Sequence, residues 1–197
     1  MQTTDTNLET TLPLRLWTVE EYQRLAEFGI LTPDEKVELI AGQIIRKMSP
    51  QKTPHAVTVT RVRRLLDNLL QDEALVITQL PVTLNDFSEP EPDIAVVIPD
   101  ELRYLANHPT PADIHLLIEI ADTTLKTDTG IKAKEYAKSG IKDYWVLDLK
   151  NRQLLVFRQP TETDYQNKQT LPENSSISPL QFPQINLQIQ QMLPPAI

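Results

Sequence analysis

The sequence has 197 residues, of which 40% are hydrophobic and 23% are charged, so it can form a core and is not a wholly disordered chain. The 27 acidic residues outnumber the 19 Lys and Arg residues, and the net charge of -8 excludes non-specific nucleic-acid binding over the whole surface. The absence of cysteine excludes disulfides, zinc ribbons and thiol nucleophiles, and three histidines argue against a histidine-rich metal cluster.

The chain has no apolar stretch of the length that spans a bilayer. Its first residues, 1–11, are polar and acidic and do not have the basic and apolar regions of a signal peptide. We therefore expect a cytoplasmic protein that does not associate with a membrane.

Apolar periodicity and turn residues divide the sequence into helices and strands in mixed order. The expected elements are a helix capped by Thr18 and Glu21 and ended by Gly29, a β-hairpin of residues 37–40 and 43–48, a helix at 54–73, strands at 75–84, 93–98 and 114–121, a helix at 129–139, and strands at 144–149 and 153–158. Residues 160–197 are rich in proline and are expected to form an irregular extension, with one further strand at 185–189. This order predicts a single α/β domain over residues 13–197, with a central mixed sheet flanked by helices, after a disordered tail of residues 1–12.

Glu119 is an acid within a strongly apolar predicted strand. Alternation of side chains places Ile114, Leu116, Ile118 and Ile120 on one face, and His115, Leu117 and Glu119 on the other. A lone carboxylate in apolar surroundings is costly to desolvate, so Glu119 needs a cation, a metal ion or water. The alternative is that Glu119 lies at the open end of the strand and is simply hydrated.

Asp93 and Glu38 are two further acids beside apolar runs. Taken separately, each has a simpler interpretation, Asp93 as a turn residue after Pro92 and Glu38 as an outward-facing residue of the hairpin. Together with Glu119 they favour a site for a hard divalent cation, because Mg²⁺ binds carboxylates, water and phosphate oxygens. Such an ion activates water and neutralises charge that develops on a phosphate.

Two lysines of the predicted 129–139 helix are candidates for the cation that this chemistry needs. The inward face of the helix is expected to contain Ala133, Tyr136 and Ala137, and its solvent face Glu135 and Lys138. Lys132 borders the inward face one turn before Tyr136, whereas Lys134 borders the opposite side. A solvated helix face is the alternative for both lysines.

Several ordered motifs give the chain a resemblance to a known family. Pro92-Asp93 and Glu119 resemble two motifs of the PD-(D/E)XK nuclease superfamily, although Ala121 stands where the third motif has lysine. Over about residues 15–160 the chain is similar to the Uma family of restriction-endonuclease-like proteins, catalogued as a domain of unknown function. The matching stretches are 37–42, 48–50 with His55, 89–96, 118–124, 128–132, 136–141 and 144–148.

The resemblance implies a restriction-endonuclease-like α/β core in which the motif lysine has moved to the following helix, at Lys132 or, as second candidate, Lys134. It also implies that Glu38, Asp93, Glu119 and Lys132 form a catalytic site. In that site Glu38, Asp93 and Glu119 would bind Mg²⁺ or Mn²⁺.

Two basic stretches predict contact with phosphate groups in an otherwise acidic chain. The first lies between residues 46 and 64, contains no acid, and comprises Arg46, Lys47, Lys52, Arg61, Arg63 and Arg64. The second, Lys126–Lys142, is diluted by Asp128 and Glu135. Ordinary surface charge is the alternative. His55, beside the first stretch, is expected to contact phosphate or position water, with a capping or core role as the alternative.

These observations lead to two hypotheses. The first is a metal-dependent nuclease that hydrolyses DNA phosphodiester bonds, expected to be a homodimer because cutting a duplex usually requires two active sites. The second is a nuclease-fold protein without catalytic activity that acts as a binding or partner protein, for example in a mobile-element or toxin-like system. The missing lysine at position 121 and the excess of acids favour the second hypothesis.

Overall fold

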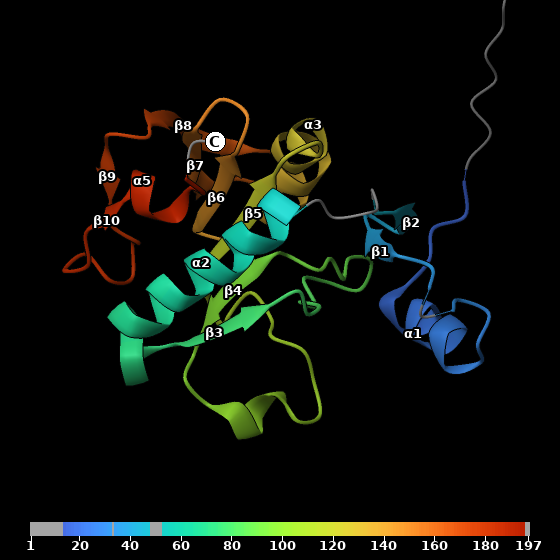
Figure 1. Cartoon of the computed structure of the whole chain (residues 1–197). Helices are drawn as coiled ribbons and strands as arrows, with labels where there is room; N and C mark the ends of the chain where they lie inside the picture. The colour runs from blue at the N-terminus through green and yellow to red at the C-terminus, as the bar shows by residue number, and fades with distance from the viewer. Residues whose placement is uncertain (1–13, 33, 48–52, 196–197) are drawn as a thin grey trace, which may run out of the picture.

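A six-stranded mixed sheet forms the centre of the protein (Figure 1). The computed structural model describes residues 14–32, 34–47 and 53–195. In spatial order the strands are β3 (Leu75–Thr78), β4 (Ile94–Val97), β5 (Ile114–Ala121), β6 (Asp143–Asp148), β7 (Gln153–Pro160) and β8 (Tyr165–Pro172). β5 and β6 run parallel, and the other neighbouring strands run antiparallel, which confirms the predicted mixed sheet.

Helices and short turns connect and cover the strands. They are α1 (Val19–Glu27), α2 (Thr53–Leu70), the 3-10 turns η1 (Gln71–Glu73) and η2 (Glu101–Tyr104), α3 (Leu125–Thr127), the π-helical turn η3 (Asp128–Lys132), α4 (Ala133–Lys138) and α5 (Ile189–Met192). Within the described ranges, no helix has the length and apolar character needed to span a bilayer.

α2 covers one face of the sheet (Figure 1). Its buried apolar side chains recur at helical spacing, at Val59, Val62, Leu66 and Leu70. They share one core with the buried side chains that β5 directs to this face, such as Ile118. Each such side chain contributes on the order of 1.5–3 kcal/mol when it is fully buried. This core fixes α2, and therefore the residues at the start of α2, relative to β5.

α4 contributes to the core on the other face. Its buried residues Tyr136 and Ala137 share a core with Leu117 of β5 and with the aromatic side chains of Tyr144 and Phe157. Gly140 follows the helix with φ of +80°, a conformation that glycine adopts without strain, and ends it as predicted.

The N-terminal part forms the expected helix and hairpin, with the predicted capping box between Thr18 and Glu21. The hairpin consists of β1 (Val37–Ile40) and β2 (Gln43–Arg46), and Gly42 has φ of +74° in its turn. A Cβ atom at Gly42 would lie 2.6 Å from the Cβ of Leu16, so only glycine fits there. Backbone hydrogen bonds join the hairpin to the segment before β4, from Gly42 N to Phe87 O at 2.7 Å and from Glu89 N to Leu39 O at 2.8 Å.

Three predicted elements differ from the structure. The strand predicted at 75–84 ends at Thr78, because the chain turns at Gln79, which has φ of +53°. The helix predicted at 129–139 begins earlier, at Leu125, and contains the π-helical turn. Residues 160–197 are more regular than predicted, since they contain β8, the short pair β9 (Ser176–Ile177) and β10 (Leu187–Gln188), and α5, joined by turns and irregular segments. The strand predicted at 185–189 is only two residues long.

β5 keeps the predicted alternation only from Leu116 onward. The pairing of β4 with β5 shifts between Val96 and Val97, so that one extra residue, His115, lies in β5. As a result Ile114 packs with the α4 core and His115 contacts Phe182, with ring centroids 5.5 Å apart. The predicted faces of Ile114 and His115 were therefore wrong. The tail of residues 1–12 and positions 48–52 lie outside the described residues.

Candidate functional site

A cavity of about 520 Å³ lies where β4 begins and β5 ends. Because β4 and β5 are antiparallel, with Ile94 opposite Ile118, the residue before β4 and the last residues of β5 meet at one edge of the sheet. Asp93 and Glu119 therefore line the same cavity. The rest of the lining comes from the hairpin and its flanks, the residue after β3, the segment before β4, the start of α2, and the stretch from the end of β5 through α3 to η3: Lys36, Glu38, Ile45, Arg46, Lys47, His55, Gln79, Glu91, Asp122, Thr123, Thr124, Thr127, Asp128 and Lys132.

Lys132 lies between two carboxylates. Its Nζ is 2.9 Å from Oε1 of Glu119 and 3.1 Å from Oε2 of Glu38. Tyr136, one turn further along, also donates to Oε1 of Glu119, at 2.9 Å. Glu38 Oε2 accepts a second hydrogen bond from the backbone N–H of Glu91 at 3.1 Å. The lysine is thus fixed from the hairpin on one side and from β5 on the other.

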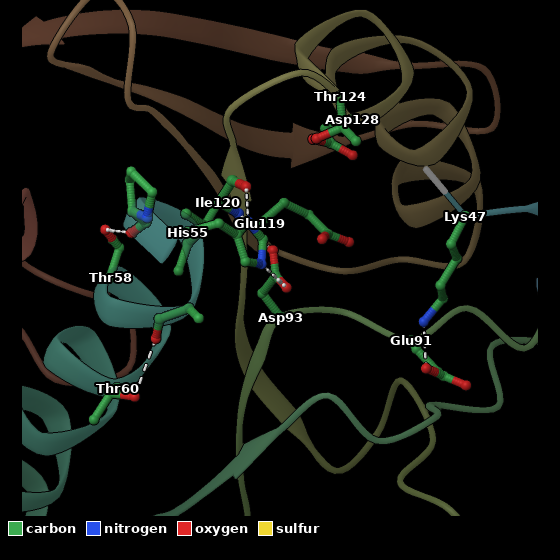
Figure 2. A network of polar contacts seen from close by, with 12 residues as sticks. Lys47, His55, Thr58, Thr60, Glu91, Asp93, Glu119, Ile120, Thr124 and Asp128 are labelled. Carbon is green, nitrogen blue, oxygen red and sulfur yellow. Dashed lines mark hydrogen bonds and ion pairs between the residues drawn. The ribbon is translucent and has the colours of Figure 1, made fainter. Parts of the chain in front are cut away.

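His55 fixes Asp93 from the first turn of α2 (Figure 2). Its Nε2 is 3.0 Å from Oδ1 of Asp93, and its Nδ1 is 2.9 Å from the carbonyl oxygen of Ile120. The other oxygen of Asp93 accepts the backbone N–H of Ile120 at 2.8 Å. A carbonyl and a carboxylate are both acceptors, so both ring nitrogens can donate only when the imidazole is protonated. These two acceptors therefore favour the protonated form of His55 as a second cation of the site.

Asp128 is a further buried acid of the cavity and lies on the π-helical turn. Residues four apart in a helical turn share a face, so Asp128 and Lys132 both point inward. The hydroxyl of Thr124 donates to Asp128 at 2.5 Å. Figure 2 shows the carboxyl group of Glu119 between those of Asp93 and Asp128, with the ion pair of Lys47 and Glu91 across from it.

The carboxyl groups and the lysine shift one another's pKa values. Burial raises the pKa of Glu119 above its ordinary value of 4.5, and neighbouring acids add to the shift although Lys132 opposes it. Burial also raises the pKa of Asp128 against the same lysine. For Lys132 burial alone would lower the pKa, but Glu119, Glu38 and Asp128 together raise it, so the ammonium group stays charged. Burial would likewise lower the pKa of His55, but its hydrogen bond to Asp93 and the charge of Asp93 raise it.

The formal charges of the cavity suit a divalent cation. In the interior of the site, ionised Glu38, Asp93, Glu119 and Asp128 would exceed the cations Lys132 and His55 by two charges, and burial, which raises the pKa of Glu119 to about 8, lets a proton offset part of this excess. The less buried lining residues are the cations Lys36, Arg46 and Lys47 and the acids Glu91 and Asp122. Each oxygen of Asp93 accepts one protein hydrogen bond, and both bonds that Glu119 accepts from side chains fall on Oε1. Carboxylate oxygens have further lone pairs, so both side chains can ligate an ion.

The protein does not supply a complete coordination shell. In the part of the chain that the structure describes, no group of three or more His, Asp or Glu side chains is arranged to hold a metal ion by itself. The residues therefore fit an ion such as Mg²⁺, which commonly takes one or two carboxylates and completes its shell with water and phosphate oxygens.

The four residues expected to form the site, Glu38, Asp93, Glu119 and Lys132, all line this one cavity. Lys134 does not line it, and its side chain is exposed. His55 contacts Asp93 and the β5 backbone, so its side chain occupies the core of the site and not its outer rim.

Glu135 was expected on the solvent face of its helix, and that prediction was wrong. The side chain is buried, because the segment before β4 packs against this face of α4. Asn85 and Ser88 of that segment donate to Glu135 Oε1 at 2.9 and 2.7 Å. Helical periodicity cannot reveal such a contact, since it joins segments far apart in the sequence.

The side chains of the two basic stretches do not form one surface but lie at several separate places. Arg46 and Lys47 line the cavity, whereas Arg61 and Arg64 line a separate groove of about 660 Å³ on α2. Arg63 pairs with Asp67, 3.5 Å away. Of the second stretch, Lys132 is buried in the site and Lys126, Lys134, Lys138 and Lys142 are exposed. Lys52 lies outside the described residues.

Sequence reasoning missed Asp128, Thr124 and Tyr136 as parts of the site. Asp128 and Tyr136 were included in stretches that match the family, but Asp128 was otherwise treated as an acid within a basic stretch and Tyr136 as a core residue, and neither was given a role in the site. The spacing of Thr124, Asp128 and Lys132 by four residues was the available signal, because such residues share one side of a helical turn.

The mixed sheet, with acids brought to one edge by β4 and β5 and a lysine on the following helix, defines a restriction-endonuclease-like α/β protein. The chain belongs to the Uma2 family, whose description is "Putative restriction endonuclease" and whose model matches residues 19–190. A crystal structure of "a putative nuclease belonging to DUF820" from Anabaena variabilis is similar, with a TM-score of 0.69 and 22% sequence identity. That match covers 91% of this chain and 97% of the other, and it confirms the fold. No curated protein matches the chain.

Proposed function

We propose that the protein is a metal-dependent nuclease that hydrolyses DNA phosphodiester bonds in the cavity at the end of β5. The observation that carries this proposal is the set of four buried carboxyl groups around one lysine and one histidine. Such a surplus of buried negative charge is costly unless a cation balances it. Membership of the Uma2 family supports the same conclusion.

Asp93 and Glu119 are the proposed ligands of Mg²⁺ or Mn²⁺. When bound, such an ion lowers the pKa of a coordinated water and neutralises charge that develops on the phosphate. The contacts of His55 and of the Ile120 N–H orient Asp93 so that its remaining lone pairs face the cavity. In the reaction a water oxygen bonds to phosphorus and one ester P–O bond breaks. The products are a phosphate monoester and an alcohol, and the proton lost by the water is balanced by the one gained by the alcohol oxygen.

Lys132 is the proposed stabiliser of negative charge on the reacting phosphate. Its ammonium group already lies 2.9 Å from Glu119, so it needs little reorganisation to reach a phosphate beside that residue. Glu38 is proposed to keep Lys132 in place through the 3.1 Å contact, and either to orient the attacking water or to take part in binding a second ion. In this proposal Lys132 of η3 takes the role of the motif lysine, whose usual position is occupied by Ala121.

Cleavage assays with site variants test the proposal. The parent protein should cut DNA in Mn²⁺ or Mg²⁺ and be inactive in EDTA. Asp93→Asn should lower the rate by about a thousandfold or more, because several kcal/mol of transition-state stabilisation depend on the ion. Lys132→Gln should also be strongly impaired. Lys134→Gln removes the same charge from the exposed side of the neighbouring helix α4 and should cut like the parent.

Equal cleavage by the parent protein and Asp93→Asn would contradict the assignment. A folded Asp93→Asn variant is expected, since its amide can still accept the Ile120 N–H, and circular dichroism provides that control.

A catalytically inactive binding or partner protein is the second candidate. Two observations favour it: Lys132 is already paired with two carboxylates, and the described residues contain no ready-made group of three metal ligands. Calorimetric titration with Mn²⁺ separates the two candidates. A nuclease site should bind the ion and lose binding in Glu119→Gln, whereas a degenerate site should give no heat with either protein.

A further inference from the structure

We propose that the site accepts a single-stranded or locally unpaired nucleic-acid segment and not an intact duplex. This inference rests on the proposed nuclease function and concerns the form of its substrate. It follows from the depth of the reactive groups, the size of the cavity and the nature of its walls.

The reactive groups lie below the surface. None of Glu38, Asp93, Glu119, Asp128 and Lys132 exposes more than 9% of its surface. A phosphate must therefore enter the cavity before it can come within hydrogen-bonding distance of Lys132. A duplex presents its phosphates on the outside of a stiff, stacked rod, whose major groove alone is about 12 Å wide. An unpaired strand can bend and turn its backbone into a pocket.

The cavity has the size of a small-ligand pocket. Its volume of about 520 Å³ lies within the range of roughly 300–1,000 Å³ that is usual for such pockets. It has room for a short piece of one strand and not for two paired strands.

The hairpin wall of the cavity is firmly attached. Leu39 of β1 is fully buried, and its carbonyl accepts the N–H of Glu89 at 2.8 Å. Glu38 contacts both Lys132 and the Glu91 N–H, and Lys47, at the same end of the hairpin, pairs with the carboxylate of Glu91. Widening the cavity for a duplex would break these contacts together, so the narrow form is the one that a substrate meets.

Two opposite walls offer groups that bind a sugar-phosphate backbone. Lys36, Arg46 and Lys47 line the hairpin side, and Thr123, Thr124 and Thr127 line the side of β5 and α3. Among the described lining residues there is no Phe, Tyr or Trp, so stacking of bases on aromatic rings is not part of this pocket. The contacts available are with phosphate and sugar, which predicts weak dependence on base sequence.

One labelled DNA strand in three forms tests the inference: alone, annealed to its full complement, and annealed to a complement that leaves a central unpaired bubble. In Mn²⁺ the single strand should be cut, the bubble should be cut within its unpaired segment, and the full duplex should be cut at least roughly tenfold more slowly. The factor follows from the few kcal/mol that unpairing requires, at about 1.4 kcal/mol per factor of ten.

Equal or faster cleavage of the full duplex would overturn the inference and leave the nuclease proposal intact. Cleavage of none of the three forms, with the protein shown to be folded, would overturn both. Cutting of a single strand requires only one active site, so a monomer that cuts it is compatible with the inference.

Variants of the hairpin wall provide a second readout. Arg46→Gln should raise KM for the single strand and reduce the slope of log KM against log salt by roughly 0.7, the value for one lost phosphate contact on a single strand. kcat should change little. Lys134→Gln, the matched loss of one charge outside the cavity, should leave the slope unchanged. The same slope in all three proteins would show that the hairpin does not contact the substrate.

Discussion

Carboxylates are buried in two regions of the protein, and the two regions differ in the hydrogen bonds and positive charges that surround these groups. Asp143, at the start of β6, is fully buried, and each of its oxygens accepts two hydrogen bonds, from Trp145, Arg158 and the Leu180 N–H at 2.8–3.3 Å. Its single charge faces the single guanidinium of Arg158, 2.8 Å away. Burial raises the pKa of Asp143, and these donors oppose the shift.

The cavity at the end of β5 has the opposite balance. Four buried acids lie around Lys132 and His55 there, and among the described residues each oxygen of Asp93 accepts a single hydrogen bond. The carboxylate of Asp143 is fully hydrogen-bonded and paired with one cation, and it joins β6 to β7 and to Leu180. The buried carboxyl groups of the cavity outnumber Lys132 and His55. This difference separates Asp143, which joins elements of the fold, from the acids that we propose as ligands of an ion.

The largest expected effect on stability separates these two regions. Asp143→Asn should cost about 3–5 kcal/mol, because it leaves the guanidinium of Arg158 without its buried partner. Asp128→Asn should cost less than about 1 kcal/mol in the metal-free protein, because it removes one charge from a cluster with too many. Denaturant unfolding in EDTA measures both. Equal losses in the two variants would show that the acids of the cavity are structural as well.

A second prediction concerns stabilisation by the ion. At a Mn²⁺ concentration of about a hundred times Kd, the free energy of unfolding of the parent should rise by about 2.7 kcal/mol. Asp143→Asn should start from a lower value and gain the same increment. Asp93→Asn should gain far less, and an undiminished gain in that variant would place the ion elsewhere.

Local patterns in the sequence were sufficient to predict most of the sheet and three of the four buried acids of the cavity, Glu38, Asp93 and Glu119. The apolar runs around Glu119 and after Asp93 identify β5 and β4, and adjacent antiparallel strands bring these two acids together. β8 was not predicted because its side chains are polar and mostly exposed, as in Gln166 and Lys168 of this edge strand. An edge strand with little buried surface has no hydrophobic pattern.

The other wrong predictions arose from a contact between distant segments of the chain or from a local irregularity in a strand or helix. Glu135 is buried by a segment about fifty residues earlier in the chain, and periodicity within α4 contains no information on it. The extra residue in β5 exchanges the faces of Ile114 and His115. The π-helical turn brings Asp128 into the cavity, and sequence alone does not distinguish such a turn from an ordinary helix start.

The smallest expected effect concerns Asp113, a carboxylate outside both regions. Burial opposes the shift, but hydrogen bonds from the N–H and hydroxyl of Thr110, at 2.8 and 2.7 Å, and the pairing with Arg103 lower the pKa of Asp113 below 3.8. The unfolded chain then takes up the proton more readily. The stabilisation is therefore present above pH 3.8 and is lost as the pH falls through the lower pKa of the folded state.

Asp113→Asn should accordingly flatten the acid side of the curve of stability against pH. The effect should stay below about 1 kcal/mol, because Arg103 is largely exposed and its charge is screened. Unfolding curves recorded at a series of acidic pH values measure it. Stability of the parent that rises as the pH falls through this range would contradict the assigned direction.

The central claim is that Asp93 and Glu119 share one divalent ion beside Lys132. A crystal structure of the protein with Mn²⁺, with data collected for the anomalous signal of manganese, tests it most directly. An anomalous peak is expected between the carboxylates of Asp93 and Glu119, within coordination distance of both. A crystal with no manganese in this cavity, or with manganese only at other carboxylates, would contradict it.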